Sequence, residues 1–352
     1  MDRLQKVLIP PRTTVKQALR KMDQAGEKTL LVAGGRRRLL GSVTDGDIRR
    51  WMLKSGRMTA PIVRVMNADP LTFPEVHERE AVKAVMAAKS FECVPIVDSQ
   101  GRVVSAIWWT DFFASPKAKT AALGLPVVIM AGGEGSRLAP LTQILPKPLM
   151  PLGGKPVLQH IMERFSGFGC RQFYLSLNYK SSLIKAYFHD LDHGYGIRYI
   201  EERKPLGTAG SLHLLRRRIK SNFFLTNCDV LIDADYGDIL DFHRKNGNAI
   251  TMVASMKHYA IPYGVCRIKS GGRLRAIDEK PEYDLLVNTG MYVLEPAVLA
   301  EVPAHTFFHV TDLIHKCVRQ KRRVGVYPIS EKSWLDIGQW DELQEAIQRF
   351  KA

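Results

Sequence analysis

The residues best suited to chemistry are two basic side chains that flank a glycine-rich segment. An apolar run at 127–130 ends in the letters AGGEGSRL, which contain Gly132, Gly133, Gly135, Ser136 and Arg137. Glycines directly after a strand let the backbone approach a phosphate and offer its N–H groups to anionic oxygens. Lys147 follows in a proline-rich stretch. Two cations beside amide donors are what the binding of a polyphosphate requires.

Two common phosphate-binding motifs do not fit this segment. A dinucleotide fingerprint needs glycine where Leu138 stands, and a Walker A loop ends in Gly-Lys followed by Ser or Thr. Leu138 breaks the first pattern, and neither Arg137-Leu138 nor Gly154-Lys155-Pro156 fits the second. We therefore expect a phosphate loop of another kind.

The elements that must position these residues are short buried strands. The run 127–130 is continuously apolar, which is typical of a buried parallel strand. A second apolar run begins at Phe223 and carries Asp229 at its C-terminal end. Ligands gather at that end of the strands in open parallel sheets. The pattern predicts an α/β fold with Asp229 near the glycine-rich loop.

The string GGEGSRL…PLT…PKPLMPL closely resembles the sugar-1-phosphate nucleotidyltransferases, of the mannose-1-phosphate guanylyltransferase and glucose-1-phosphate thymidylyltransferase type. The resemblance spans about residues 126–345. It implies a Rossmann-like domain at 127–352 with a mixed, mostly parallel sheet. It also implies an enzyme that transfers a nucleoside monophosphate from a nucleoside triphosphate to a sugar-1-phosphate. Pyrophosphate would leave, and the product would be an NDP-sugar for glycan or glycoconjugate synthesis.

The resemblance also assigns roles to individual residues. Arg137 and Lys147 would be catalytic, and Asp229 and Asp336 would hold Mg²⁺, which binds through one or two carboxylates plus substrate phosphates. The residues implied to bind the nucleotide are Gly132, Gly133, Gly135, Ser136, Glu202 and Gly207. Those implied on the sugar-phosphate side are Tyr263, Gly264, Glu279, Lys280 and Asn288. Ser136 and Cys228 are not expected to be nucleophiles, because neither has a neighbouring base in a motif.

The identity of the base rests on one physical argument. The resemblance puts Glu202 at the base edge, and a carboxylate accepts two donors at once. Guanine offers N1–H beside N2–H₂, whereas thymine and uracil offer one N–H between two carbonyls. We therefore expect GTP, with dTTP, UTP or CTP as the alternatives.

The first 119 residues contain a repeated pattern of helix, strand, turn, strand and helix. The repeats occupy about 1–57 and 58–119. The segment 114–126 is rich in small residues, contains Lys117 and Lys119 and is bracketed by prolines, and its last part, 120–126, reads as a linker. Asp47 and Asp111 occupy corresponding positions, 64 residues apart. That period is too long for a solenoid.

The repeats resemble a tandem pair of CBS domains, an α+β fold, on the basis of Gly41-x-Val43-Thr44-x-x-Asp47. In that family the Thr and Asp hold the ribose of an adenine nucleotide, which implies Thr44, Asp47 and Asp111 as candidates. Trp108 replaces the Thr in the second repeat. An alternative is that both aspartates only cap helices.

Composition narrows the remaining choices. The 352 residues include 51 Lys and Arg against 35 Asp and Glu, a net charge of +16 that attracts polyanions. The excess is spread over both halves and no nucleic-acid module is present, so we expect no nucleic-acid partner. The N-terminal residues carry no apolar signal segment, and the five cysteines are scattered. We expect a cytoplasmic homo-oligomer without membrane contact.

Two further readings remain open from the sequence. The same fold could use a phosphocholine acceptor, although that ligand prefers an aromatic cage. The chain could also be a nucleotide sensor with an inactive transferase domain. Intact Arg137, Lys147, Asp229 and Asp336 argue against that reading.

Overall fold

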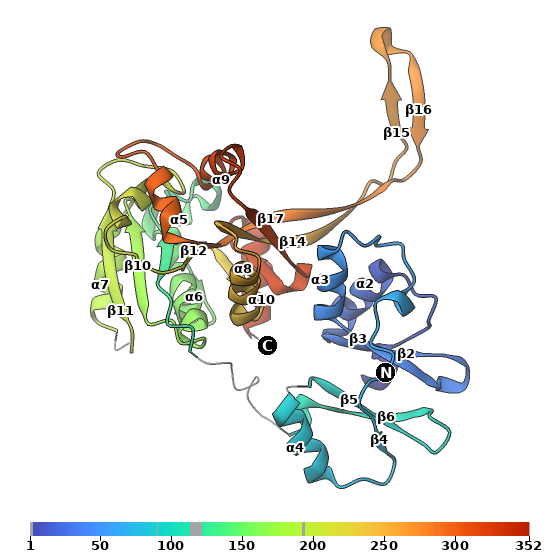
Figure 1. The fold of residues 1–352 in the computed structure, drawn as a ribbon. Coiled ribbons are helices and arrows are strands. Elements are labelled where there is room, and N and C mark those ends of the chain that lie inside the picture. Colours follow the sequence, from blue (N-terminus) through green and yellow to red (C-terminus); the bar gives the residue numbers. More distant parts are fainter. Residues whose placement is uncertain (1–2, 90, 113–121, 192–193, 352) are drawn as a thin grey trace. The chain divides into compact units, whose positions relative to one another are not determined.

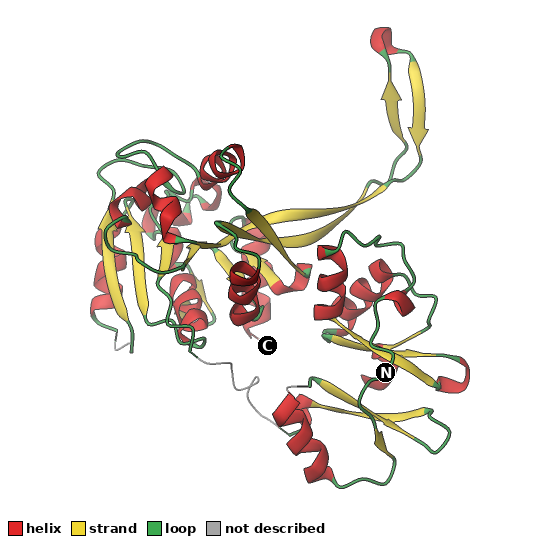
Figure 2. Ribbon diagram, in the orientation of Figure 1, coloured by secondary structure: helices red, strands yellow, loops and turns green. Residues whose placement is uncertain are grey.

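The computed structural model describes residues 3–89, 91–112, 122–191 and 194–351. The chain divides into two compact units, Met1–Lys119 and Thr120–Ala352. The start of the expected linker at 120–126 lies outside the described residues. Figures 1 and 2 show the secondary structure of each unit.

The first unit contains two small sheets of identical topology. In each sheet the first strand is parallel to the second, and the second is antiparallel to the third. The elements of the first repeat are α1 (Arg3–Val7), β1 (Leu8–Ile9), α2 (Val15–Ala25), β2 (Thr29–Ala33), β3 (Leu39–Thr44) and α3 (Asp45–Leu53). Those of the second repeat are β4 (Phe73–Pro74), α4 (Arg79–Lys89), β5 (Cys93–Val97), β6 (Val103–Trp108) and the 3₁₀ turn η3 (Trp109–Asp111).

Contacts between the repeats make them one unit. The N–H of Leu39 donates to the carbonyl of Gly101 at 2.9 Å, which joins the two β-turns. The Arg3 guanidinium lies 4.1 Å from the centroid of the Trp108 ring, within cation–π range. The N-terminal helix is thereby anchored to the second repeat.

The second unit is built on a seven-stranded sheet with the order β11-β10-β7-β12-β17-β14-β18. Only β17 runs antiparallel to its two neighbours, so the sheet is mixed and mostly parallel. The strands are β7 (Val127–Met130), β10 (Gln172–Leu177), β11 (Gly196–Glu201), β12 (Phe223–Asn227), β14 (Ile250–Ala260), β17 (Glu282–Leu294) and β18 (Val324–Ile329).

Helices and short strand pairs complete this unit. The α-helices are α5 (Leu141–Ile144), α6 (Val157–Ser166), α7 (Ser181–His189), α8 (Tyr236–Lys245), α9 (Val310–Arg319) and α10 (Trp340–Lys351). The two-stranded pairs are β8 (Pro151–Leu152) with β9 (Lys155–Pro156), β13 (Val230–Ile232) with β19 (Trp334–Asp336), and β15 (Val265–Ile268) with β16 (Leu274–Asp278). The 3₁₀ segments used below are η4 (Ser136–Leu138), η5 (Lys147–Leu149) and η6 (Gly210–Leu215).

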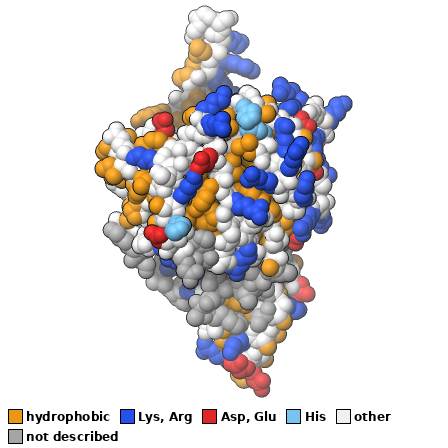
Figure 3. Space-filling model, turned by 90° about the vertical axis from the view of Figure 1, so that its left-hand side faces the viewer, with side chains coloured by type: hydrophobic (Ala, Val, Ile, Leu, Met, Phe, Trp, Pro, Cys, Tyr) orange, Lys and Arg blue, Asp and Glu red, His pale blue; other side chains and the backbone are white. Residues whose placement is uncertain are grey.

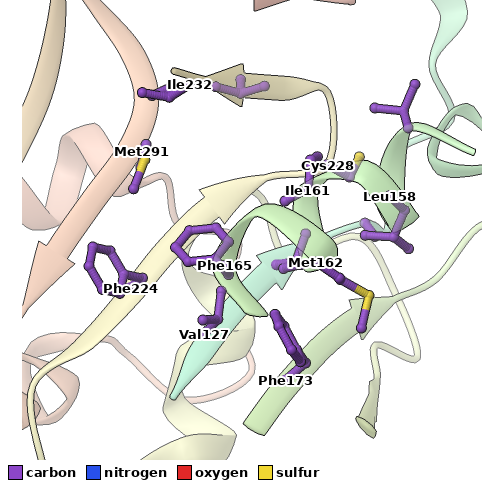
Figure 4. Close-up of a cluster of buried hydrophobic side chains, with 14 of the residues drawn as sticks. Val127, Leu158, Ile161, Met162, Phe165, Phe173, Phe224, Cys228, Ile232 and Met291 are labelled. Atoms are coloured by element: carbon purple, nitrogen blue, oxygen red, sulfur yellow. The ribbon is translucent and has the colours of Figure 1, made fainter. Parts of the chain in front are cut away.

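The central strand β7 is buried on both faces, as its apolar run predicts. Val127 and Ile129 belong to one hydrophobic cluster, and Val128 and Met130 belong to another. Figure 4 shows the first cluster, in which side chains of α6 such as Phe165 pack on the sheet. Burial on both faces fixes the register of β7 and therefore the place where its C-terminal loop begins.

One part of the second unit departs from this compact body. Residues 259–283, which we call the arm, form a two-stranded ribbon that projects beyond the sheet (Figure 1). Ile268, Leu274 and Ile277 on the arm are 66%, 54% and 55% exposed. The described arm has no second layer over these side chains, so its apolar face is solvated.

The surface carries the basic excess that the composition indicates. Figure 3 shows Lys and Arg side chains spread over much of one face, with Asp and Glu at few places. No described helix is long and apolar enough to cross a membrane.

Candidate active site

The glycine-rich loop follows β7 and is shaped by close contacts with the segment that carries Lys147. Gly135 has a φ of +68°, and a Cβ there would lie 2.9 Å from Thr142 and 3.1 Å from Lys147. The Thr142 hydroxyl donates to the carbonyl of Gly135 at 3.0 Å. Glycine is therefore required at 135, both for its backbone conformation and for space. Gly132, Gly133 and Ser136 belong to the same loop, and Gly133 and Ser136 are exposed.

Asp229 and Asp336 are distant in sequence and adjacent in the fold. Strand β13 pairs with β19, which sets Val230 opposite Asp336. The N–H of Ile337 donates to the carbonyl of Asp229 at 2.9 Å. The N–H of Cys228 donates to the carbonyl of Met130, which holds this end of β12 beside the glycine-rich loop. Strand pairing thus brings both carboxylates to the loop.

Two basic side chains complete this cluster. Lys147, which is 8% exposed, forms an ion pair and hydrogen bond with Asp229 Oδ2. Arg137 Nη2 lies 3.5 Å from the position of a Cβ on Gly338, and Asp336 Oδ1 lies 2.8 Å from the same position. Arg137 makes no hydrogen bond or ion pair with any described residue, so its guanidinium can bind an anion. The structure therefore brings together Arg137, Lys147, Asp229 and Asp336.

The electrostatics of the cluster favour a cation. Burial and then the neighbouring Asp229 raise the pKa of Asp336, while the N–H of Gly338, Lys147 and Arg137 lower it. The net increase shows that the basic groups do not fully offset burial and the second carboxylate. A bound divalent cation would relieve that repulsion.

The donor set fits magnesium. In the described ranges, no three His, Cys, Asp or Glu side chains are grouped so that they could hold a metal. The protein would therefore offer the two carboxylates alone. Mg²⁺ binds in this way, keeping several waters and taking its remaining ligands from phosphates.

Cys228 and Ser136 do not have the surroundings of nucleophiles. Burial, and then the adjacent Asp229, raise the pKa of the Cys228 thiol to about 12. A thiol of that kind is protonated and inert at neutral pH. Ser136 is exposed and no described side chain forms a hydrogen bond with its hydroxyl.

Glu202 lies at the end of β11, next to the glycine-rich loop. Its Oε1 atom is 3.5 Å from the position of a Cβ on Gly132, and the side chain is 8% exposed. The Oε1 atom accepts from the Ser176 hydroxyl at 2.6 Å, and Oε2 accepts from the N–H of Leu206 at 2.9 Å. The predicted base-reading carboxylate is thus close to the loop and held in one orientation.

Gly207 lies in a loop supported by residues 306–310. The N–H of Phe308 donates to the carbonyl of Leu206, and the N–H of Ala209 donates to the carbonyl of Phe308. A Cβ on Gly207, whose φ is +78°, would lie 2.7 Å from the Phe308 carbonyl oxygen. Glycine at 207 lets the two segments pack directly.

The predicted sugar-phosphate residues fall into two groups. Asn288 lies in β17, and a Cβ on the nearby Gly290 would be 2.6 Å from Asn227, at the end of β12. Tyr263, Gly264, Glu279 and Lys280 lie on the arm and are exposed. No hydrogen bond or ion pair among the described residues joins these four to Asp229 or Asp336. The structure does not bring them to the cluster.

Several polar residues near the site were missed from the sequence. Ser176 and Ser211 line the interior side of Glu202, and Asn178 donates to the carbonyl of Glu202 at 2.6 Å. Ser176 interrupts the apolar strand QFYLSL, and Asn178 and Asn227 each directly follow or end a strand. A polar residue inside an apolar strand, or at its C-terminal end, is the signal that could have found them.

In the first unit, the candidate nucleotide residues act as helix caps. The Thr44 hydroxyl donates to Asp47 Oδ2 at 2.7 Å, and the N–H of Asp47 donates to Thr44 Oγ1 at 3.2 Å. Arg50 pairs with the other oxygen of Asp47. In the second repeat, Asp111 Oδ2 accepts from the N–H of Trp108 at 2.7 Å. Capping therefore accounts for both aspartates, while a ribose role remains a prediction.

Comparison with known proteins identifies the family of the second unit. The family model described as nucleotidyl transferase matches residues 126–352. The chain belongs to the nucleotidyl transferase family. A model of the CBS domain matches residues 3–54, within the first repeat. The nucleotidyltransferase resemblance and the presence of a CBS domain at the N-terminus are confirmed. The assignment of the second repeat to the same family stays a prediction.

Named relatives share this nucleotidyl transferase region. The chain is 32% identical to the mannose-1-phosphate guanylyltransferase catalytic subunit beta of Danio rerio over 223 residues. The aligned region covers 61% of each protein. It is 33% identical to the mannose-1-phosphate guanyltransferase of Candida albicans, covering 60% of each. The chain thus spans about three fifths of the length of these relatives.

Solved structures support the same fold. The crystal structure of HddC from Yersinia pseudotuberculosis matches with a TM-score of 0.51 and 25% identity, covering 64% of this chain and 99% of that one. The inositol-1-phosphate CTP transferase of T. maritima matches with a TM-score of 0.50 and 20% identity, covering 66% and 97%. The predicted mixed, mostly parallel α/β sheet is confirmed.

Proposed function

We propose that this chain is a sugar-1-phosphate nucleotidyltransferase that transfers a nucleoside monophosphate from GTP to a sugar-1-phosphate and releases pyrophosphate. The observation that carries the proposal is the convergence of Arg137, Lys147, Asp229 and Asp336 beside a glycine-rich loop. The two relatives described above are named for mannose-1-phosphate, which makes that sugar phosphate the first acceptor to test.

The reaction needs charge neutralisation more than proton transfer. The attacking phosphate oxygen is already an anion, so no protein nucleophile is required, and the barrier comes from bringing two polyanions together. Arg137, free of protein partners among the described residues, would bind the β- and γ-phosphate oxygens as pyrophosphate leaves. Lys147 would contact the α-phosphate, where both substrates meet.

Asp229 and Asp336 would hold Mg²⁺. When bound, this ion supplies charge stabilisation to the phosphate oxygens of both substrates. The residues themselves orient the site. Asp229 fixes the Lys147 ammonium through their ion pair, and the N–H of Gly338 fixes Asp336 Oδ1 at 2.8 Å.

Recognition of guanine rests on Glu202 and the loop that contains Gly207. Each Glu202 oxygen accepts one hydrogen bond from the protein, and a carboxylate oxygen can accept a second. Two adjacent acceptors match N1–H and N2–H₂ of guanine. The Glu202→Gln change replaces one acceptor with a donor and is therefore expected to reduce the preference for GTP over dTTP more than turnover.

The sugar-phosphate side would combine Asn288 with residues of the arm, Tyr263, Gly264, Glu279 and Lys280. Glu282 is six residues before Asn288, which is about 20 Å along an extended strand. The arm would therefore have to curl toward the sheet for Lys280 to meet the phosphate. An acceptor other than a sugar, such as phosphocholine, is the second candidate.

In the first unit, an adenine nucleotide at Thr44 and Asp47 is the proposed regulatory ligand, with Asp111 in the second repeat. Binding would require the Thr44 hydroxyl to exchange its bond with Asp47 for one with ribose. Titration of the full chain with ATP and AMP by calorimetry tests this proposal. Absence of binding heat would leave helix capping as the function of these residues.

One experiment tests the transferase proposal. The full chain is incubated with MgCl₂ and each pairing of GTP, dTTP, UTP, CTP or ATP with mannose-1-phosphate, glucose-1-phosphate or phosphocholine, and released pyrophosphate is measured. We expect the highest rate with GTP and a sugar-1-phosphate. Release with no pairing, while nucleotide still binds, would favour a nucleotide sensor instead.

A further inference from the structure

Three buried polar side chains form a continuous chain behind the proposed base pocket. Ser211 on η6 lies 2.7 Å from Ser176 on β10, and Ser176 lies 2.6 Å from Oε1 of Glu202. The three residues are 1%, 0% and 8% exposed. Burying a hydroxyl costs free energy unless it is hydrogen-bonded, so these hydrogen bonds hold the three side chains in defined positions. We call the series Ser211–Ser176–Glu202 the relay.

The direction of the hydrogen bonds follows from the number of hydrogens. A carboxylate carries no hydrogen to donate, so Ser176 must donate its one hydroxyl hydrogen to Glu202. Ser176 then has nothing left to donate, so Ser211 is the donor in the 2.7 Å contact between the two hydroxyls. The Met130 sulfur, at 3.9 Å, is a more distant and weaker acceptor for Ser211. The relay therefore has a fixed polarity from Ser211 through Ser176 to Glu202.

The other side of Glu202 is held by the main chain. Oε2 accepts from the N–H of Leu206, the Glu202 N–H donates to the carbonyl of Leu177, and Asn178 donates to the Glu202 carbonyl. Among the residues that the structure describes, each Glu202 carboxylate oxygen accepts one side-chain or main-chain hydrogen bond, which leaves one acceptor position on each oxygen. The carboxylate is thus oriented before any ligand arrives.

We propose that Ser176 and Ser211 are positioning residues for base selection, which act through Glu202. The inference rests on the proposed function, in which Glu202 reads the base. An oriented carboxylate binds two neighbouring donors without first losing its rotational freedom, so the relay favours guanine over uracil. Without Ser176, Oε1 lacks a buried donor and Glu202 can turn away from the base.

The test measures binding of GTP and UTP to the full chain by calorimetry, together with kcat and KM for GTP. The variants are Ser176→Ala, Ser211→Ala, the double variant and Glu202→Gln. Ser255→Ala is the matched control, because Ser255 is equally buried and its hydroxyl has no hydrogen-bond partner among the described residues. Thermal unfolding is recorded for every variant.

We expect Ser176→Ala to reduce the ratio of the UTP and GTP Kd values about 10-fold, with a larger change in KM than in kcat. Ser211→Ala should reduce the ratio about 3-fold. Because Ser211 acts through Ser176, the double variant should match Ser176→Ala alone. Ser255→Ala should leave the ratio unchanged.

Three results would overturn the inference. The first is an equal loss of affinity for GTP and UTP. The second is a double variant whose effect on the Kd ratio is the sum of the two single effects. The third is a Kd ratio that no serine variant alters. If Glu202→Gln shifts base preference while the serine variants do not, the proposed function stands and the relay fails. If Glu202→Gln leaves the ratio unchanged, the base contact in the proposed function fails as well.

Discussion

The nucleotide side and the sugar side of the proposed site are built in different ways. On the nucleotide side, Lys147 is 8% and Glu202 is 8% exposed, and both have protein partners. On the sugar side, Tyr263 is 74% exposed, and neither the Lys280 nor the Glu279 side chain makes a hydrogen bond or ion pair with a described residue. One side is set by the packed core, and the other is carried on a solvated ribbon.

The two sides therefore differ in how well their side chains are oriented before substrate binds. Buried and paired side chains keep their orientation, so the nucleotide side is preorganised. A two-stranded ribbon without a covering layer is only marginally stable in water and can bend. Changes on the nucleotide side should therefore alter turnover or nucleotide binding, whereas changes on the arm should alter only the affinity for the acceptor.

The largest effect is expected for Asp336→Asn. Loss of a carboxylate that would hold Mg²⁺ should lower kcat by about 10²–10³-fold, since each group that stabilises the transition state contributes on that scale. The same change should not lower the free energy of unfolding. Burial and Asp229 destabilise the Asp336 carboxylate, and Asn keeps the acceptor for the N–H of Gly338.

The measurements are pyrophosphate release and urea unfolding. Asp190→Asn is the control, because that side chain is 87% exposed and its ion-pair partner is the equally exposed His189. It should alter neither quantity. Excess EDTA should stop pyrophosphate release by the unaltered protein, and MgCl₂ should restore it. Full activity of Asp336→Asn would remove this residue from the site.

Two glycine substitutions should separate space needed by the protein from space needed by the nucleotide. A Cβ at Gly338 would lie 2.8 Å from Asp336 Oδ1, so Gly338→Ala must displace that carboxylate. We expect kcat to fall about 10–100-fold. A Cβ at Gly133 would meet nothing within 4 Å, so Gly133→Ala should leave stability unchanged. Gly133→Ala should raise the KM for GTP about 10-fold, because the added methyl group would occupy space that the proposed site gives to a phosphate.

Steady-state kinetics and thermal unfolding distinguish these outcomes. Gly35→Ala in the first unit is the matched control, since a Cβ there also meets nothing within 4 Å. If Gly133→Ala binds GTP normally, the phosphates do not lie on this loop.

The nucleotide side was predictable from sequence because its residues lie in continuous motifs at strand ends. Asp229 ends an apolar strand, and the glycines follow another, so their common edge could be inferred from the parallel sheet. Pairing of β13 with β19, which sets Asp336 beside Asp229, was not readable from strands of three residues. The resemblance alone linked those two aspartates.

Other parts were not predictable for physical reasons. The arm's alternating residues resemble those of any sheet strand, and the sequence does not say that no second layer covers them. The relay from Ser211 to Glu202 joins three elements through side chains, with no periodic pattern to mark it. In the first unit, the sequence at Thr44 and Asp47 fitted helix capping and ribose binding equally well. In the structure these two residues cap helix α3.

The arm gives an intermediate effect. Lys280→Ala should raise the KM for the sugar-1-phosphate about 10-fold, which is typical for one lost hydrogen bond to a charged phosphate. The KM for GTP and the unfolding temperature should stay unchanged, because the side chain is exposed. Lys269→Ala, also on the arm, is the control. If the KM for the sugar-1-phosphate does not change, the arm lies outside the acceptor site.

The smallest effect is on the pH dependence of stability, and it concerns only the buried body. Burial lowers the pKa of His243 to about 4, and its Nδ1 atom is hydrogen-bonded to the Thr251 hydroxyl at 2.9 Å. In the unfolded chain the imidazole has a pKa near 6.5. The unfolded state therefore binds a proton first as the pH falls from 6.5 toward 4, and the folded state loses stability across that window. Between pH 7.5 and pH 5, protonation at this site lowers the free energy of unfolding by about 1–2 kcal/mol.

Urea unfolding at pH 7.5 and pH 5 measures this effect. The free energy of unfolding should change less between the two pH values for His243→Gln than for the native chain. His243 does not lie on the arm, so Lys280→Ala should show the same pH dependence of the free energy of unfolding as the native protein. An equal pH dependence in His243→Gln and the native protein would mean that His243 is not the group that titrates.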